Sequence, residues 1–229
     1  KSDKNSDEFD NLLFVRRDIE EFSIPSNIKI ISSCVFRYCR KLTKVEISSN
    51  SNLQIIESYA FSESNIEEIF IPSKVSKICK YAFADCLNLT KIEIPPNSNL
   101  QTIEKCAFKR SNIKEIIIPQ KVSKICIEAF SNCYDLIKIE IPPNSNLQVI
   151  GLSAFSGSKI NEIYFPASLK ELKEGWCCST FKLNNIIISP LNGQFKFIDD
   201  KYLLGKSDKN SDEFDNLLFV RRDIEEFSI

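Results

Sequence analysis

Several residue types that build active sites are absent or scarce in this chain of 229 residues. It has no histidine and no methionine, one tryptophan and five glycines, and its formal net charge is −1. Histidine is the usual general base and the commonest metal ligand near neutral pH, so its absence argues against an enzyme. A chain without excess positive charge does not attract nucleic acid or an anionic membrane. We therefore expect neither catalysis nor nucleic-acid binding.

Two further absences concern membranes and metals. No apolar run approaches the about 18 residues that a spanning helix needs, so we expect no direct membrane insertion. The nine cysteines include no C-x-x-C pair, so we expect no zinc site, no other metal and no cofactor. The chain begins at Lys1 without a methionine, and we expect it to be a piece of a longer protein. The absence of a signal peptide or an anchor from this sequence therefore says nothing about the full protein.

What the chain does contain is a repeat. Four apolar residues followed by proline are spaced 47 residues apart: Ile24-Pro25, Ile71-Pro72, Ile118-Pro119 and Phe165-Pro166. Each period divides into two similar coils, marked by Phe36, Phe61, Phe83, Phe108, Phe130 and Phe155. Repeats of about 20–29 residues with a Leu-x-x-Ile-x-Ile core are typical of a leucine-rich-repeat solenoid. We therefore predict an α/β solenoid, a right-handed leucine-rich-repeat superhelix with a parallel β-sheet on one face.

The repeat also predicts individual elements. Eight strands are expected, centred on Phe22, Val45, Ile69, Ile92, Ile116, Ile139, Ile163 and Ile186. On the opposite face, the Ile-x-x-x-Ala-Phe segments, such as 78–83, predict short helical or 3₁₀ turns with the phenylalanine inside the coil. The pattern fails once, at Trp176-Cys177. The region from Phe195 to Val220 contains apolar runs around a polar loop and predicts an inserted β-hairpin.

The cysteines follow the same period. Cys39, Cys86 and Cys133 are 47 residues apart, and Ser64, Ser111 and Ser158 hold that place in the alternate coils. Cysteines two coils apart are separated by about 10 Å, which is more than the about 7 Å that a disulfide allows between Cα atoms. We predict a buried, reduced and unbridged ladder. Cys34 and Cys106 hold the repeat position that Tyr59, Tyr81 and Glu128 hold in other coils, so we expect both cysteines to be exposed. The sequence leaves their redox state undecided.

The first 24 residues recur, identical, as residues 206–229. This repeat favours a tandem array of 205-residue units, whose number the sequence leaves open; an engineered duplication is the alternative. The predicted domains are residues 1–18 as the second half of a truncated hairpin, 19–192 as the solenoid, 193–223 as the hairpin insertion and 224–229 as the first strand of the next unit.

A truncated hairpin has consequences for the chain ends. We predict that Leu12–Val15 forms a strand without a partner, and that residues 1–10 are disordered. An open strand edge invites pairing with another chain. We therefore expect head-to-tail self-association, with residues 224–229 of one molecule near residues 19–24 of the next.

Two motifs carry a resemblance to a known family. Ile-Gly-x-x-Ala-Phe at 150–155 and Ala-Phe-x-x-Cys at 82–86 are similar to the BspA-like leucine-rich repeats, and the hairpin resembles one that this family places between blocks of coils. Only Gly151 matches the usual glycine of the family, since Cys79 and Cys126 hold that position elsewhere. The resemblance implies a surface or secreted protein of bacteria or protists that adheres to host or matrix proteins.

The exposed strand face offers two rows of candidate residues. The first is a charge ladder with alternating signs: Glu21, Lys44, Glu68, Lys91, Glu115, Lys138 and Glu162. It predicts cross-strand ion pairs that fix the register, with direct ligand contact as the alternative. The second row is a candidate partner-binding stripe: Phe70, Glu93, Ile117, Glu140, Tyr164 and Ile187. Aromatic side chains on an open sheet favour protein binding, although β-propensity alone also explains them. The predicted function is non-enzymatic protein binding and adhesion; a structural stalk without a specific ligand is the alternative.

Overall fold

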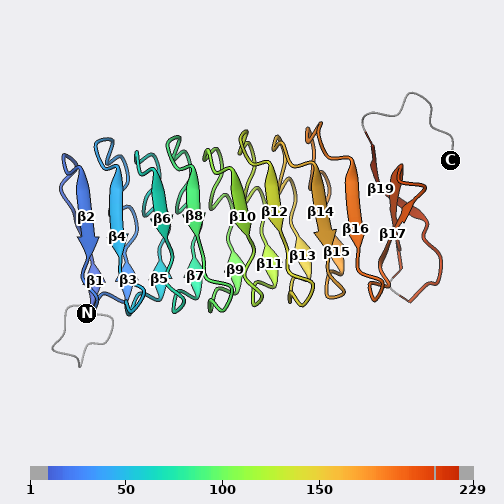
Figure 1. Cartoon of the computed structure of the whole chain (residues 1–229), viewed down its shortest axis with the longest axis horizontal. Helices are drawn as coiled ribbons and strands as arrows, with labels where there is room; N and C mark the ends of the chain where they lie inside the picture. Colours follow the sequence, from blue (N-terminus) through green and yellow to red (C-terminus); the bar gives the residue numbers. More distant parts are fainter. Residues whose placement is uncertain (1–9, 209, 222–229) are drawn as a thin grey trace.

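The computed structural model describes residues 10–208 and 210–221, which form 19 β-strands. The coils stack along the long axis of the molecule, so that its colour changes steadily from one end to the other (Figure 1). The longer strands form one row: β2 (Glu21–Ile24), β4 (Lys44–Ile47), β6 (Glu68–Phe70), β8 (Lys91–Glu93), β10 (Glu115–Ile117), β12 (Lys138–Glu140), β14 (Glu162–Phe165) and β16 (Asn185–Ile188). These are the eight strands that the repeat predicts.

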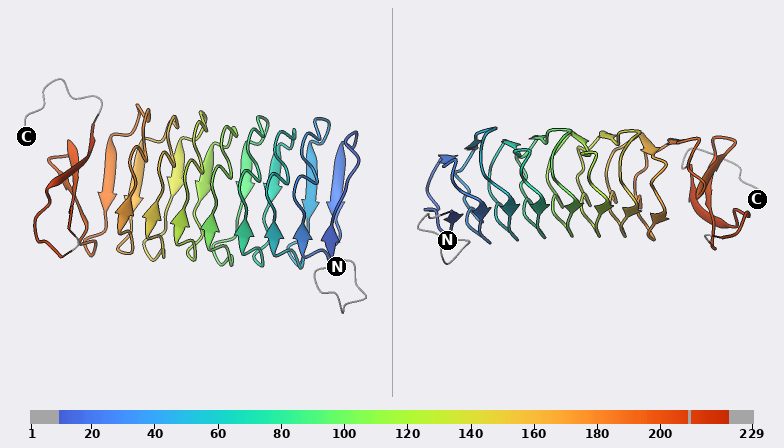
Figure 2. Two further views of the ribbon diagram at one scale, coloured as in Figure 1. Left: turned by 180° about the vertical axis from the view of Figure 1, so that it is seen from behind. Right: turned by 90° about the horizontal axis from the view of Figure 1, so that it is seen from below.

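A second row of strands was not predicted. It consists of β1 (Asn11–Leu12), β3 (Ile30–Ile31), β5 (Ile55–Ile56), β7 (Lys77–Ile78), β9 (Thr102–Ile103), β11 (Lys124–Ile125), β13 (Val149–Ile150) and β15 (Glu171–Leu172). These two-residue strands form one parallel, eight-stranded sheet in chain order. The longer strands pair in three blocks, β2-β4-β6-β8, β10-β12 and β14-β16. The two rows run beside each other along the molecule (Figures 1 and 2).

The predicted helical or 3₁₀ turns are wrong, because the described residues contain no helix. The segment after each short strand from β3 to β15 instead contains two residues with positive φ, four positions apart, such as Tyr81 at 60° and Asp85 at 58°. Corresponding pairs are Cys34 and Tyr38, Tyr59 and Glu63, Cys106 and Arg110, and Glu128 and Asn132. A left-handed residue interrupts a right-handed helix. The segments therefore form successive tight turns.

These turns also hold adjacent coils together. The backbone N–H of Phe61 donates to the carbonyl of Ala82 in the next coil at 2.8 Å, whereas the N–H of Ser62 donates to Tyr59 in its own coil at 3.2 Å. The same alternation follows in the neighbouring coils. An α-helix would satisfy its N–H groups within itself and leave none for the next coil. Hydrogen bonds between stacked coils thus take the place of the hydrogen bonds within the expected helix.

A column of phenylalanine rings, one in each of six successive coils, runs through the core. Phe36, Phe61, Phe83, Phe108, Phe130 and Phe155 are fully buried, as predicted. Neighbouring ring centroids lie 4.7–5.6 Å apart, with ring planes within 10° of parallel. At the start of the column, Phe22 meets Phe36 edge to face at 5.3 Å. The column gives each of these six coils the same apolar filling.

The departure at Trp176 marks the end of this column. The Trp176 ring is buried and contacts Phe165 edge to face, with 5.6 Å between centroids. Phe165 in turn contacts Phe195 in the same manner at 5.7 Å. Edge-to-face contacts change the direction of the rings. This cluster therefore joins the last coil to the element that follows it.

That element is an antiparallel sheet of β17 (Phe195–Ile198), β18 (Tyr202–Gly205) and β19 (Asn216–Val220), in which β18 is central. It has three strands rather than the two of a simple hairpin (Figure 2). At the other end of the chain, the predicted unpaired strand at Leu12–Val15 is wrong. The strand there is β1, and it pairs in parallel with β3. The predicted disorder of residues 1–9 and the predicted strand at 224–229 lie outside the described residues, and Asp10 is fully buried.

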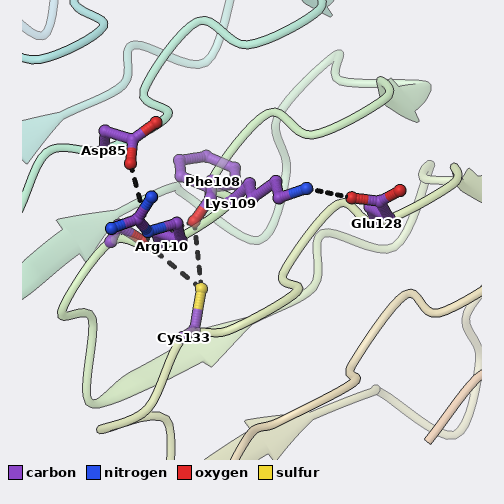
Figure 3. Close-up of polar contacts among 7 residues, drawn as sticks. Asp85, Phe108, Lys109, Arg110, Glu128 and Cys133 are labelled. Carbon is purple, nitrogen blue, oxygen red and sulfur yellow. Dashed lines mark hydrogen bonds and ion pairs between the residues drawn. The ribbon is translucent and has the colours of Figure 1, made fainter. Parts of the chain in front are cut away.

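The cysteine ladder is buried as predicted, because Cys39, Cys86 and Cys133 have no exposed surface. The Cys133 thiol donates to the carbonyl oxygen of Phe108 at 3.0 Å (Figure 3), and Cys86 donates to Phe61 at the same distance. Burial raises the pKa of the Cys86 and Cys133 thiols to about 12. Both side chains are therefore neutral near pH 7.

The predicted exposure of Cys106 is wrong, since only 1% of this residue is accessible, whereas Cys34 is half-buried. Cys106 lies between the longer side chains of Tyr81 and Glu128 in the adjacent coils, and its sulfur is 3.8 Å from Glu128 Oε2. The hydrogen bond between the Cys106 and Tyr81 side chains raises the pKa of the Tyr81 hydroxyl to about 12. A short side chain in a row of long ones is covered by its neighbours.

Asn192 connects the last coil to the antiparallel sheet. Its side-chain amide donates to the carbonyls of Pro166 at 2.8 Å and Leu169 at 3.0 Å. Its amide oxygen accepts the backbone N–H groups of Gln194 at 2.9 Å and Phe195 at 3.3 Å. The side chain is buried, so these groups have little access to water as a substitute partner.

We expect Asn192→Ala to lower the free energy of unfolding by about 1–3 kcal/mol, because it leaves buried polar groups unpaired. Urea unfolding followed by circular dichroism measures this loss. Asn184→Ala at an exposed position is the matched control and should stay within about 0.5 kcal/mol of the parent. An equal effect of the two substitutions would contradict the connecting role of Asn192.

Candidate binding face

The outward side of the long strands brings the predicted charge ladder into register. Parallel pairing places Glu21 opposite Lys44, Lys44 opposite Glu68 and Glu68 opposite Lys91. Farther along, Glu115 lies opposite Lys138, while Glu162 lies opposite Asn185 and accepts a hydrogen bond from it at 2.6 Å. All seven members, Glu21, Lys44, Glu68, Lys91, Glu115, Lys138 and Glu162, are exposed.

The lysines of this ladder divide their contacts between two sets of carboxylates. Lys91 lies 3.9 Å from Glu68 on the neighbouring strand. Lys44 instead contacts Glu46 on its own strand at 2.7 Å, and Lys138 contacts Glu140 in the same way at 3.7 Å. The hydrogen bond from Lys44 lowers the pKa of the Glu46 carboxyl, with a second hydrogen bond from Ser23. Such exposed pairs stabilise a fold little.

The predicted stripe lies beside the ladder on the same face. Phe70 is paired with Glu93, Ile117 with Glu140, and Tyr164 with Ile187. Ile117 is 45% exposed and Ile187 43%, whereas Phe70 and Tyr164 are half-buried. The structure thus brings these residues into one row. Apolar and acidic side chains alternate in it over the five long strands β6, β8, β10, β12 and β14.

Three hollows follow one another along this face. One, of about 490 Å³, lies over β2 to β8 and is lined by Ser23, Glu46, Phe70 and Glu93. A second, of about 610 Å³, spans β8, β10 and β12 around Ile117. A third, of about 730 Å³, lies over β12 and β14 around Tyr164. The last two lie where the pairing of the long strands is interrupted. Each hollow therefore contains one apolar member of the stripe and charged side chains beside it.

Sequence reasoning missed an apolar hollow beside the short strands. Its volume is about 720 Å³, and its lining includes Cys126, Ile127, Val149, Gly151 and Leu152. A Cβ atom at Gly151 would lie 2.6 Å from the carbonyl carbon of Cys126, so a side chain there requires the backbone to shift. The glycine was visible in the sequence, but a single one does not indicate a hollow.

Sequence reasoning also missed a polar and aromatic row on the turns. The rings of Tyr59 and Tyr81 stack with centroids 4.8 Å apart, and the Arg37 guanidinium lies 4.8 Å from the Tyr59 centroid. Farther along, Arg110 pairs with Asp85 at 3.3 Å, and Lys109 pairs with Glu128 (Figure 3). These contacts join successive coils, so their effect is on stacking.

The described residues hold no group of three or more His, Cys, Asp or Glu side chains arranged for a metal ion. They also form no helix that is long and apolar enough to cross a membrane.

The coil geometry and the repeat define a leucine-rich-repeat solenoid. The family model described as BspA type leucine rich repeat region matches residues 7–137 and 81–202 with six copies. The chain belongs to this family. No curated protein matches its sequence at a significant level.

Solved structures share the fold. The pneumococcal vaccine antigen PcpA has a TM-score of 0.63 and 24% identity, over 83% of this chain and 45% of that protein. A leucine-rich repeat protein from Bacteroides ovatus has a TM-score of 0.56 and 22% identity, over 76% of this chain and 56% of that protein. A leucine rich cell surface protein from Faecalibacterium prausnitzii has a TM-score of 0.55 and 20% identity, over 83% of this chain and 52% of that protein. The chain thus spans about half the length of these proteins, and at these identities the likeness concerns the fold.

Proposed function

We propose that this chain is a non-enzymatic binding module, displayed at a cell surface as part of a longer tandem array, that adheres to a host or matrix protein. The observation that carries the proposal is the row of hollows on the strand face, each with one apolar member of the stripe beside lysine and glutamate side chains. A few anchor residues, aromatic ones above all, supply most of the energy in protein interfaces, and charged surroundings supply selectivity. Surface display is supported by the cell-surface description of one solved structure.

The face suits a protein segment better than a small molecule. The hollows are open and lie in a line along successive strands, so an extended partner contacts several of them at once. Phe70, Ile117 and Tyr164 would anchor it, since they recur on every second strand. Glu93 and Glu140 lie between these anchors and favour basic or amide groups on the partner.

The test replaces Phe70, Ile117 and Tyr164 together with serine. Binding to immobilised, purified matrix proteins, with collagen and laminin as probes, should weaken at least about thirtyfold, because truncation of even one anchor residue costs about 2 kcal/mol or more. The thermal melt should remain nearly unchanged, since these side chains are at least partly exposed.

The matched control replaces three exposed apolar residues that line none of the hollows described above, Leu87, Phe181 and Leu191, with serine. This variant should bind like the parent. Unchanged affinity of the first variant would refute the stripe as the site. A parent chain that binds no probe would favour the structural stalk.

A further inference from the structure

The repeated 24-residue segment places one sequence in two environments. Residues 10–15 are identical to residues 215–220, and both stretches are described. In the first copy this sequence contains β1, which is the end strand of the eight-stranded sheet. In the second copy it contains β19, which is the end strand of the antiparallel sheet. In each copy, the described strand is therefore the last one in its sheet.

The first copy buries one side of the segment against the solenoid. Asp10 is fully buried and lies 3.2 Å from the ammonium group of Lys29. Leu12 packs against the core, and Val15 is 5% exposed. The other side faces outward, because Leu13 and Phe14 are 70% and 71% exposed.

The second copy buries the opposite side. Phe219, which corresponds to Phe14, is 5% exposed and pairs with the buried Leu203 of β18. Leu218, which corresponds to Leu13, packs against the core close to Gly205. The side that the first copy buries is open here, since Asp215 is exposed and Leu217 is 41% exposed.

We propose that this segment is a two-sided joint, and that Leu13 and Phe14 bind the β17–β18 hairpin of a second copy of this chain, as Leu218 and Phe219 do within one chain. The hairpin already accommodates this sequence, so the fit is given by the second copy itself. A segment with both sides occupied covers Leu13 and Phe14, which removes an exposed apolar patch from the surface.

The two copies compete for the same hairpin. Within one chain β19 already occupies β18, and residues 11–15 of another chain can replace it only when β19 is released. Replacement joins the end of one molecule to the start of the next, in a head-to-tail contact that does not close on itself. In consecutive units, one segment would serve both neighbours.

The test weakens β19 and leaves the first copy intact. Phe219→Asp in the full chain should open the hairpin, and sedimentation should show assemblies that grow with protein concentration, whereas the parent chain stays mainly monomeric. Adding Phe14→Asp should return Phe219→Asp to the monomer. The same substitution in the same sequence thus has opposite effects at its two positions. Phe14→Asp alone should keep the melting temperature of the parent, because Phe14 is exposed.

Two further arms guard against misfolding and nonspecific aggregation. A synthetic peptide with the sequence of residues 206–221 should fill the open hairpin and dissociate the Phe219→Asp assemblies. Leu218→Asp, which keeps Phe219 opposite Leu203, should associate more weakly and should also become monomeric with Phe14→Asp. Association that persists in the double variant, or a Phe219→Asp variant that is monomeric at every concentration, would overturn the proposal.

Discussion

Phe108→Ala should lower the free energy of unfolding by about 3–5 kcal/mol. The Phe108 ring is fully buried and stacks between Phe83 and Phe130, with 5.3 Å between centroids on each side. Its removal leaves a cavity in the middle of the column and deletes two ring contacts at once. Because a coil in a solenoid packs only against its neighbours, no distant element can fill the gap.

Urea unfolding monitored by circular dichroism measures this loss. Phe181→Ala is the matched control, because it removes the same side chain from a position that is 74% exposed. We expect the control to change stability by less than about 0.5 kcal/mol. Similar losses in the two variants would mean that the column does not support the fold.

The features that the sequence predicted correctly recur in every coil or in every second coil. The long strands, the phenylalanine column and the burial of Cys39, Cys86 and Cys133 each repeat at a fixed spacing. Repetition turns a weak local preference into a strong pattern. Once the register of one coil is known, the others follow.

The second sheet and the left-handed turns could not be read in this way. A two-residue strand is too short to show an alternation of apolar and polar residues. The left-handed positions carry Tyr81 and Asp85 rather than glycine, the residue that usually marks such a conformation. The backbone hydrogen bonds between stacked coils favour these turns, and such bonds leave no trace in the local sequence.

The candidate face was partly predictable for a related reason. Spacings of 23 and 24 residues gave the register of the ladder, which pairing of the long strands reproduces. They did not give the choice of Lys44 between Glu46 on its own strand and glutamates on adjacent strands, because long side chains reach several partners. The two sides of residues 10–15 also required the fold, since identical sequences cannot reveal two different environments.

The buried thiols of Cys86 and Cys133 should react with an alkylating reagent at least about a thousandfold more slowly than Cys178, which is exposed. Only the thiolate is nucleophilic, and a pKa of about 12 leaves about one thiol in ten thousand ionised at pH 8. Alkylation of the native protein without reductant, followed by mass spectrometry, gives the rate at each cysteine. Rapid labelling of Cys86 and Cys133, or a disulfide between members of the ladder, would refute a buried and reduced ladder.

The same burial predicts a loss of stability at alkaline pH. The folded-state pKa of Cys86 and Cys133 is about 12, above the ordinary value of 9.0, so unfolded thiols release their protons first as the pH rises. Their stabilising effect is therefore complete below about pH 9 and is lost progressively toward pH 12. Lysine and tyrosine side chains titrate in the same range, so the parent is compared with the double variant Cys86→Ala/Cys133→Ala. The urea midpoint of the parent should fall more steeply between pH 9 and 11 than that of the variant. Parallel curves would show that these thiols ionise as readily in the folded chain as in the unfolded one.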